Sequence, residues 1–321
     1  MPSKAKAAPS TNAHALVARM REGDRRATAR IVTELERLSP DLPALIEALT
    51  PHLGHALIVG FTGPPGAGKS TLVNAYTSHL RQSGKTVGII AVDPSSPVSG
   101  GAILGDRIRM TATLDDDGVF MRSLASRGHL GGLCPAAVRV IDALDGAGKD
   151  VILLETVGTG QSEIDVAEVA DVRIVVLAPG LGDDIQAMKA GLLEIADILV
   201  VNKADREGAE RTLHQLMGAS SLRLQTGPKP AVLKTAAVSG EGVAALAEAI
   251  SERGRLRLAV EARERRRRRA RYLIARAAAD LIAERVRAGR ELNLDALADA
   301  VLTGRVLPID AAKKLMDGQT S

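Results

Sequence analysis

Hydrophobic residues along the chain follow two patterns that alternate with each other. Short apolar runs at residues 55–62, 86–92, 151–155, 172–178, 197–202 and 231–237 indicate strands that are buried on both faces. Between these runs the apolar positions recur at helical spacing. The alternation predicts βαβ units, and therefore an α/β fold with a mostly parallel sheet and helices on both faces. In such a fold the ligand is expected at the carboxyl ends of the strands.

Helical patterns flank this central region on both sides. Before it, apolar residues at helical spacing are interrupted at Gly23 and around Pro40 to Pro43; after it, helical spacing continues from Gly254, with breaks at Gly304 and Pro308. We therefore predict a disordered tail at 1–12, a helical extension at 13–54, a nucleotide domain at 55–252 and a C-terminal helical arm at 253–321.

One stretch after the first apolar run has the composition of a phosphate-binding loop. Its residues are Gly63, Pro64, Pro65, Gly66, Ala67, Gly68, Lys69, Ser70 and Thr71, and a helical pattern follows. The glycines let successive backbone N–H groups turn toward phosphate oxygens, and the helix N-terminus adds a favourable dipole. Lys69 is predicted to reach the β- and γ-phosphates and Ser70 to ligate Mg²⁺. The strand, the full spacing and the helix together predict a P-loop NTPase.

Acidic residues that follow other strands are candidates for the metal site. Asp93 and Asp106 are candidate ligands of Mg²⁺ or of its waters, because this ion prefers hard oxygen ligands; the alternative for Asp93 is a turn-initiating role before Pro94. Glu155 stands where P-loop proteins hold the metal through a carboxylate, and Gly158 where a glycine N–H senses the γ-phosphate. The sequence leaves open whether Glu155 acts through water or orients the nucleophile.

A second motif indicates which base is bound. Asn202, Lys203 and Asp205 form an N-K-x-D pattern after a predicted strand, and the Asp205 carboxylate would accept two hydrogen bonds from guanine that adenine cannot supply. Ala236 and Ala237 lie where GTPases present a backbone N–H to guanine, although the usual serine is absent. The predicted ligands are therefore GTP or GDP with Mg²⁺.

The composition limits which partners and which cellular location are expected. No run approaches the about 20 apolar residues of a membrane span, and the N-terminus lacks a signal-peptide pattern, so we expect a soluble, cytoplasmic protein. Between Arg253 and Arg290 there are 14 arginines against four acidic residues, so the basic charge belongs to one segment. Without interleaved aromatic residues this segment does not favour nucleic acid. We interpret the five arginines from Arg265 to Arg269 as a solvated helix face.

Several motifs in combination resemble the MeaB/ArgK family of GTPases. They are the P-loop and the segments 92–96, 127–132, 155–163, 179–186 and 202–205, and the resemblance covers about residues 13–315. It implies a homodimeric GTPase, joined through its C-terminal arm, that chaperones a B12-dependent acyl-CoA mutase. Such a chaperone gates delivery of adenosylcobalamin and protects or reactivates the mutase. The segments 93–109 and 155–163 would be switches, and 180–189 an additional switch that touches the partner.

Hydrolysis in this scheme needs positioning more than covalent chemistry. Lys69, Glu155 and Gln161 are the candidate catalytic residues, although Gln161 lies three positions beyond Gly158 rather than next to it. No arginine stands at a position that identifies it as an arginine finger for the transition state. We predict a slow intrinsic GTPase that a partner accelerates.

Two other functions remain as alternatives to a mutase chaperone. One is an ATPase or kinase associated with arginine and ornithine (LAO/AO) transport, which would leave the guanine-reading motif without purpose. The other is a metallochaperone-type GTPase; such proteins carry His or Cys clusters, whereas this chain has six scattered histidines and one cysteine.

Overall fold

The computed structural model describes residues 11–93, 116–125, 135–156, 162–180, 192–221, 229–287 and 294–317. It divides into two compact units, Met1–Arg269 and Ala270–Ser321. The sheet and everything that surrounds the P-loop belong to the first unit.

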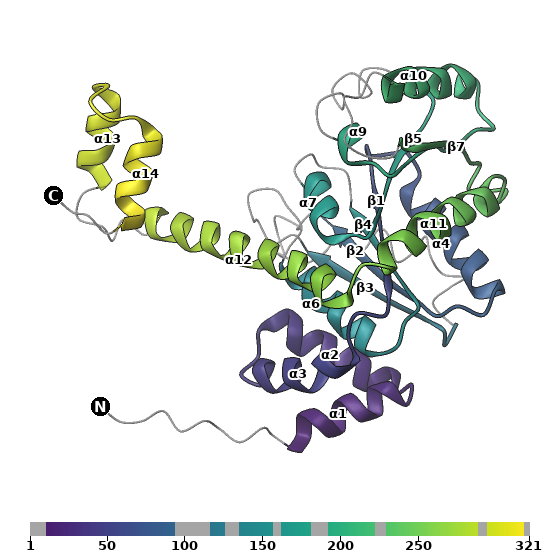
Figure 1. Ribbon diagram of the computed structural model, residues 1–321, viewed down its shortest axis with the longest axis horizontal. Coiled ribbons are helices and arrows are strands. Elements are labelled where there is room, and N and C mark those ends of the chain that lie inside the picture. Colours follow the sequence, from purple (N-terminus) through teal and green to yellow (C-terminus); the bar gives the residue numbers. More distant parts are fainter. Residues whose placement is uncertain are drawn as a thin grey trace. The chain divides into compact units, whose positions relative to one another are not determined.

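The described residues of the first unit are built on a seven-stranded sheet (Figure 1). The strands are β1 (Leu57–Thr62), β2 (Val87–Asp93), β3 (Val119–Ala125), β4 (Val151–Thr156), β5 (Val172–Leu177), β6 (Ile198–Val201) and β7 (Ala231–Lys234). Their order is β3-β2-β4-β1-β5-β6-β7, and every neighbouring pair is parallel. The α/β prediction is confirmed, and all carboxyl ends lie along one edge of the sheet.

Strand β3 is the strand that the sequence pattern did not predict. Its residues alternate poorly, because Arg122 and Ser123 interrupt the apolar run that begins at Val119. The strand lies at the sheet edge and pairs only with β2 among the described strands. An edge strand needs less apolar character than a central one, so its hydrophobic signal is weak.

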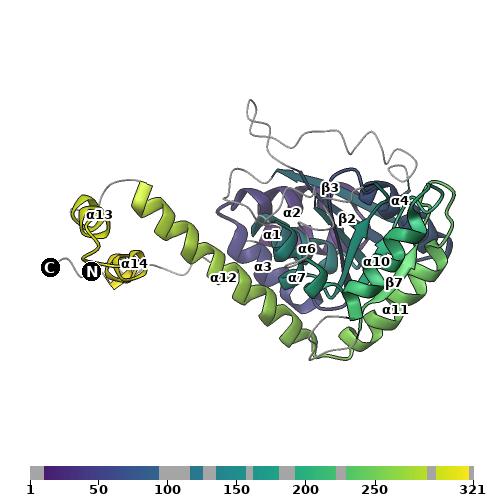
Figure 2. The ribbon, with the colours of Figure 1, turned by 90° about the horizontal axis from the view of Figure 1, so that it is seen from above.

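Helices cover both faces of the sheet, as Figures 1 and 2 show. The flanking helices are α4 (Lys69–Gln82), α6 (Pro135–Gly146), α7 (Ser162–Val169), α9 (Leu192–Ile195), α10 (Ala209–Ser221) and α11 (Val243–Leu258). Val59 and Phe61 of β1 pack in the core beneath α4 and α11. Gly60 lies on the opposite face, where a Cβ would meet Val166 of α7 at 2.2 Å. Successive residues of the central strand thus face different helical layers, which is why the whole strand is apolar.

The N-terminal extension consists of α1 (Thr11–Arg21), α2 (Arg25–Arg37), α3 (Leu42–Leu49) and the short 3₁₀ helix η1 (Thr50–His52). The break between α1 and α2 occurs at Gly23, where φ is 91°. Asp24 then caps α2 by accepting hydrogen bonds from the N–H groups of Arg26 and Ala27. The predicted interruptions at Gly23 and near Pro40 are confirmed.

The start of α12 (Ala262–Arg287) corrects the interpretation of the arginine run. Arg265 is only 6% exposed and Arg269 only 3%. The Arg265 guanidinium donates to Asp171 Oδ2 at 3.1 Å and to the carbonyl of Gly54 at 2.5 Å. The prediction of a solvated face is therefore wrong for these two arginines, because side chains one helical turn apart point into the first unit, where Arg265 meets the buried carboxylate of Asp171. The second unit continues α12 and adds α13 (Leu294–Leu302) and α14 (Pro308–Asp317).

Within the part of the chain that the structure describes, none of the helices combines the length and apolar character needed to cross a lipid bilayer.

Candidate nucleotide-binding site

The P-loop connects the carboxyl end of β1 to the first turn of α4. Lys69 is the first residue of α4 and is 6% exposed. Its Nζ donates hydrogen bonds to the carbonyl oxygens of Gly63 at 2.8 Å and Pro64 at 3.0 Å. The ammonium group therefore lies inside the loop, at the N-terminus of a 14-residue helix. Both features favour an anion at this position.

Two glycines of the loop occupy positions that a side chain could not share. Gly63 has φ of 135°, and a Cβ there would lie 2.1 Å from the carbonyl oxygen of Val176 in β5. Gly68 has φ of 85°, and its Cβ would lie 2.5 Å from the side-chain nitrogen of Asn202. The glycines thus allow the loop to pass close to β5 and to the N-K-x-D segment.

Ser70 and Glu155 meet between α4 and β4. The Ser70 hydroxyl donates to Glu155 Oε1 at 2.5 Å, and Glu155 is 2% exposed. The parallel register explains the meeting, because Glu155 pairs with Phe61, the second-to-last residue of β1, and the P-loop begins right after that strand. A hydroxyl and a carboxylate oxygen at one point form the hard donor set that Mg²⁺ prefers, so these residues fit the ion.

The other two metal candidates are only partly placed. Asp93 is the last residue of β2, one step beyond the Val92–Thr156 pair, so its backbone lies at the same edge of the sheet as Glu155. Nothing is described of its side chain. Asp106 lies outside the described residues.

Asn202 joins the P-loop to the segment after β7. It is 1% exposed, and its side-chain nitrogen donates to the carbonyls of Ala67 at 3.0 Å and Gly68 at 3.3 Å. Its oxygen accepts hydrogen bonds from the Thr235 hydroxyl at 3.1 Å and from the Ala237 N–H at 3.2 Å. One buried amide therefore fixes two loops that are 135 and 35 residues away in sequence.

The remaining members of the N-K-x-D motif lie beside this bridge. Lys203 has a left-handed backbone, with φ of 56°, and its Nζ donates to the carbonyl of Gly66 at 2.6 Å. Its aliphatic stem therefore crosses toward the P-loop. Asp205 is exposed two residues later, and Ala236 and Ala237 are buried. The structure thus brings the P-loop, N-K-x-D and the Ala236–Ala237 segment together.

Two contacts at this edge involve residues to which the sequence assigned no role. Thr235, which is fully buried, holds the Asn202 oxygen through its hydroxyl. Thr156 donates to the Thr62 hydroxyl at 3.3 Å and so ties the ends of β4 and β1. Their only sequence signal is a threonine directly at or after a strand end, which is too common to be specific.

Several predicted functional residues lie outside the described part of the chain. They are Gly158 and Gln161, together with most of the predicted switch segments 93–109, 155–163 and 180–189. Their roles stay predictions.

Comparisons with known proteins agree with this geometry. The family model "Methylmalonyl Co-A mutase-associated GTPase MeaB" matches residues 28–291. A protein called putative GTPase from Pyrococcus horikoshii is 51% identical over 241 residues, which cover 74% of this chain and 76% of that protein. The mouse mitochondrial methylmalonic aciduria type A homolog is 38% identical over 199 residues, 60% of this chain and 48% of that protein.

A solved structure described as a LAO/AO transport system kinase superposes with a TM-score of 0.75 at 26% identity, covering 97% of this chain and 99% of that one. The sheet and the P-loop found here are thus shared with that protein, and the family model and the Pyrococcus relative are described as GTPases. The family match spans most of the chain, including the N-K-x-D segment and the buried start of α12. The chain therefore belongs to the MeaB family of GTPases.

Proposed function

We propose that this chain is a Mg²⁺-dependent GTPase that chaperones an adenosylcobalamin-dependent acyl-CoA mutase of the methylmalonyl-CoA mutase type. In this role it gates cofactor delivery and protects or reactivates the mutase. The GTPase part of the proposal rests on the hydrogen bonds of Asn202, which hold the P-loop and the Ala236–Ala237 segment together at the N-K-x-D motif. The client is inferred from the family, whose description names the mutase.

Phosphate binding uses the inward-facing groups of the P-loop. Lys69 Nζ exchanges the carbonyls of Gly63 and Pro64 for oxygens of the β- and γ-phosphates, which are stronger acceptors because they are charged. Ser70 and Glu155 hold Mg²⁺, with Asp93 and Asp106 as further candidates. When bound, the ion neutralises charge that develops on the phosphates during transfer.

Base selection uses the segment beyond Asn202. The Asp205 carboxylate accepts hydrogen bonds from guanine N1 and N2, the Lys203 stem covers the base, and the Ala236–Ala237 segment lies beside its O6 edge. A hydrogen bond from this segment to O6 would replace one that it makes within the protein, to Glu241 or to Asn202. Adenine cannot supply the two donors, so an adenine nucleotide would leave the carboxylate unpaired.

Hydrolysis requires water in line with the γ-phosphate. Glu155 and Gln161 are the candidates to position it, and Gly158 N–H senses the phosphate. With these groups alone we expect slow turnover, which the mutase accelerates. The protein acts in the cytoplasm as a homodimer joined through the arm at 253–321.

A kinase or ATPase serving arginine and ornithine transport is the competing proposal, because the solved structure with the TM-score of 0.75 carries that description. The two proposals differ in the nucleotide. A fluorescent GDP displaced by GTP but not by a 100-fold excess of ATP supports the GTPase, whereas equal displacement by ATP supports the kinase.

Co-elution with a mutase tests the chaperone role. Purified protein is mixed with methylmalonyl-CoA mutase and with a nonhydrolysable GTP analogue, GDP or no nucleotide, and the mixture is separated by size. We expect a complex whose amount depends on the nucleotide. The absence of a complex in all three states would refute the proposed client.

Asp205→Asn supplies a matched control for this experiment. An amide in place of the carboxylate favours xanthine over guanine, because xanthine presents an acceptor where guanine presents a donor. The variant should form the complex with a xanthosine triphosphate analogue and not with the GTP analogue. A complex with the GTP analogue at wild-type strength would show that the mutase does not respond to nucleotide at this site.

A further inference from the structure

A second cavity lies at the opposite edge of the sheet from the P-loop. It has a volume of about 780 Å³ and is lined by residues at the amino ends of β1 and β4, in the C-terminal half of α4 and along α11. Strand β1 begins at Leu57 in the cavity and ends at Thr62 before the P-loop. Six strand residues span roughly 20 Å, so the cavity is separate from the nucleotide site. Its volume is in the range of small-molecule sites, about 300–1,000 Å³.

The floor and part of the walls are apolar. Leu57 and Val151 form the floor at the strand ends, and Leu80 and Leu258 contribute from the two helices. The α11 wall includes small residues at one helical face, which are Ala244, Ala247 and Ser251, while Gly254 packs directly against Leu57, where a Cβ would meet that side chain at 2.7 Å. These small side chains leave space beside the apolar floor for a ring-sized or branched apolar group.

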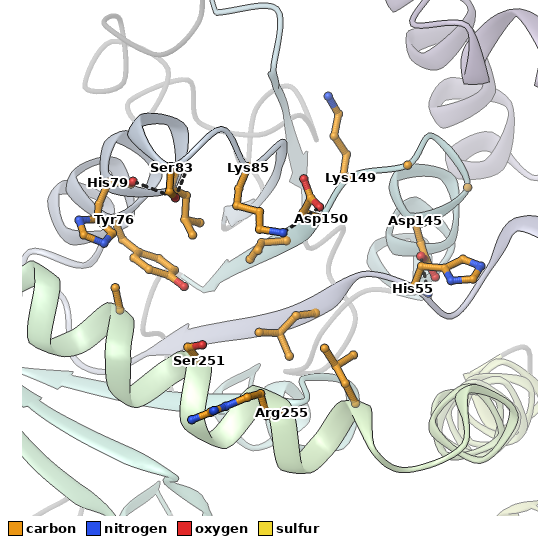
Figure 3. Close-up of a pocket in the computed structure, with 18 of the residues that line it drawn as sticks. His55, Tyr76, His79, Ser83, Lys85, Asp145, Lys149, Asp150, Ser251 and Arg255 are labelled. Carbon is orange, nitrogen blue, oxygen red and sulfur yellow. Dashed lines mark hydrogen bonds and ion pairs between the residues drawn. The ribbon is translucent and has the colours of Figure 1, made fainter.

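One buried polar group is directed into this space. Tyr76 of α4 is 2% exposed, and its hydroxyl has no hydrogen-bond partner among the residues that the structure describes. Figure 3 shows this hydroxyl directed toward α11 and Ser251. Burial also raises the pKa of Tyr76, so it stays a neutral donor. The ring is buried, but the hydroxyl itself is not sealed from solvent, so it can donate a hydrogen bond to a ligand atom in the cavity.

Cationic and neutral donors accompany Tyr76 on the two helices. Arg255 of α11 makes no side-chain ion pair or hydrogen bond with the described residues, and the imidazole of His79 on α4 likewise has none. Lys85 adds a further positive charge at the rim. The C-terminal ends of α4 and α11 contribute partial negative charge of about one half each, which the full charges of Lys85 and Arg255 exceed.

The carboxylates around the cavity are largely occupied by other groups. Both oxygens of Asp145 accept hydrogen bonds from backbone N–H groups, those of residues 54–56. Asp150 accepts from the backbone and hydroxyl of Thr86 at 2.8 and 2.9 Å and lies 3.4 Å from Lys85. Glu248 is the remaining acidic residue of the lining. The cavity is therefore better suited to an anion than to a cation.

A metal site is a weaker explanation of the same residues. Three histidines line the cavity, but among the described residues no group of three or more potential ligands is arranged to hold a metal ion.

We propose that this cavity binds a small amphipathic organic anion, with its apolar body on Leu57 and Val151 and its carboxylate, phosphate or sulfonate among Tyr76, Ser251 and Arg255. The proposal does not depend on the client of the GTPase. Because α4 runs from the P-loop to this cavity, both sites contact the same helix.

The probe for the test is 8-anilinonaphthalene-1-sulfonate, compared with N-phenyl-1-naphthylamine, which has the same rings without the sulfonate. Both are titrated by fluorescence into the full chain saturated with GDP and Mg²⁺. We expect one saturable site for the sulfonate and binding at least 10-fold weaker for the neutral compound. No saturable binding of the sulfonate, or equal binding of both compounds, would overturn the proposal.

Variants locate the binding in this cavity. Ser251→Trp fills it from an exposed position and should weaken sulfonate binding at least 10-fold, while GDP binding reports that the protein is folded. Tyr76→Phe and Arg255→Gln remove single donors and should each weaken the sulfonate several-fold without changing the neutral compound. Arg211→Gln, an exposed arginine on α10, is the control and should bind as the wild type. Undiminished binding to both Ser251→Trp and Arg255→Gln would show that the site is elsewhere.

Discussion

Replacing Asn202 with alanine is expected to separate the P-loop from the base-reading segment. The side chain makes four hydrogen bonds, two to P-loop carbonyls and two to Thr235 and Ala237. At about 1 kcal/mol each, and with buried partners left unpaired, the loss amounts to about 3–5 kcal/mol of unfolding free energy. If about 3 kcal/mol of this holds the nucleotide-binding arrangement, affinity for GDP falls on the order of 100-fold.

Thr235→Val is the matched variant, because it removes one hydroxyl from the same bridge and keeps the side-chain shape. It deletes a single hydrogen bond, so about 1 kcal/mol and roughly a five-fold loss of affinity are expected. Both variants are measured by urea unfolding without nucleotide and by titration of fluorescent GDP. Wild-type GDP affinity in Asn202→Ala, or equal losses of GDP affinity in the two variants, would refute the prediction. The Asn202 amide would then not be what holds the P-loop to the segment after β7.

Three further predictions concern the loop, the α12 anchor and pH. Gly68→Ala should weaken GDP binding, measured by titration, much more than Gly66→Ala. Both glycines have positive φ, but only a Cβ at position 68 would meet another residue, the side-chain nitrogen of Asn202 at 2.5 Å. Asp171→Ala should lower the unfolding free energy by about 3–5 kcal/mol in urea, because it leaves the buried Arg265 without its carboxylate. Burial raises the pKa of Asp142 to about 6, so the native state binds the extra proton between about pH 4 and 6. Unfolding free energy should therefore fall by about 3 kcal/mol as pH rises through that window, and Asp142→Asn should remove this component.

Each of these three has an outcome that contradicts it. Equal affinity losses at Gly66 and Gly68 would mean that backbone strain alone, and not the contact at position 68, determines the loss of GDP affinity. Arg267→Gln, whose partner Glu264 is half exposed, should cost little; a loss equal to that of Asp171→Ala would remove the distinction between buried and exposed pairs. Asp142 has Arg266, Arg269 and Asp145 as charged neighbours, and an unchanged pH profile in Asp142→Asn would assign the titration to another group.

The central sheet and the nucleotide site could be predicted from sequence because their signals are local. A strand buried on both faces is a continuous apolar run, and the P-loop carries its glycines, lysine and serine in one stretch. The N-K-x-D motif is likewise contiguous, and its place after a strand follows from the same pattern.

What the sequence did not predict depends on contacts between distant residues. The burial of Arg265 requires Asp171, which is 94 residues away, and a run of five arginines gives no sign that this one pairs with a buried carboxylate. The role of Thr235 requires the Asn202 oxygen, 33 residues earlier. The second cavity combines ends of strands and helices that have no motif in common, so only the packed arrangement shows it.

The proposed function is tested most directly by the rate of GTP hydrolysis, measured against increasing concentrations of methylmalonyl-CoA mutase with Mg²⁺ present. We expect a slow rate for the protein alone and a saturable acceleration by the mutase, absent with ATP. A rate that does not change at any mutase concentration would contradict the proposed coupling between this GTPase and a B12-dependent mutase.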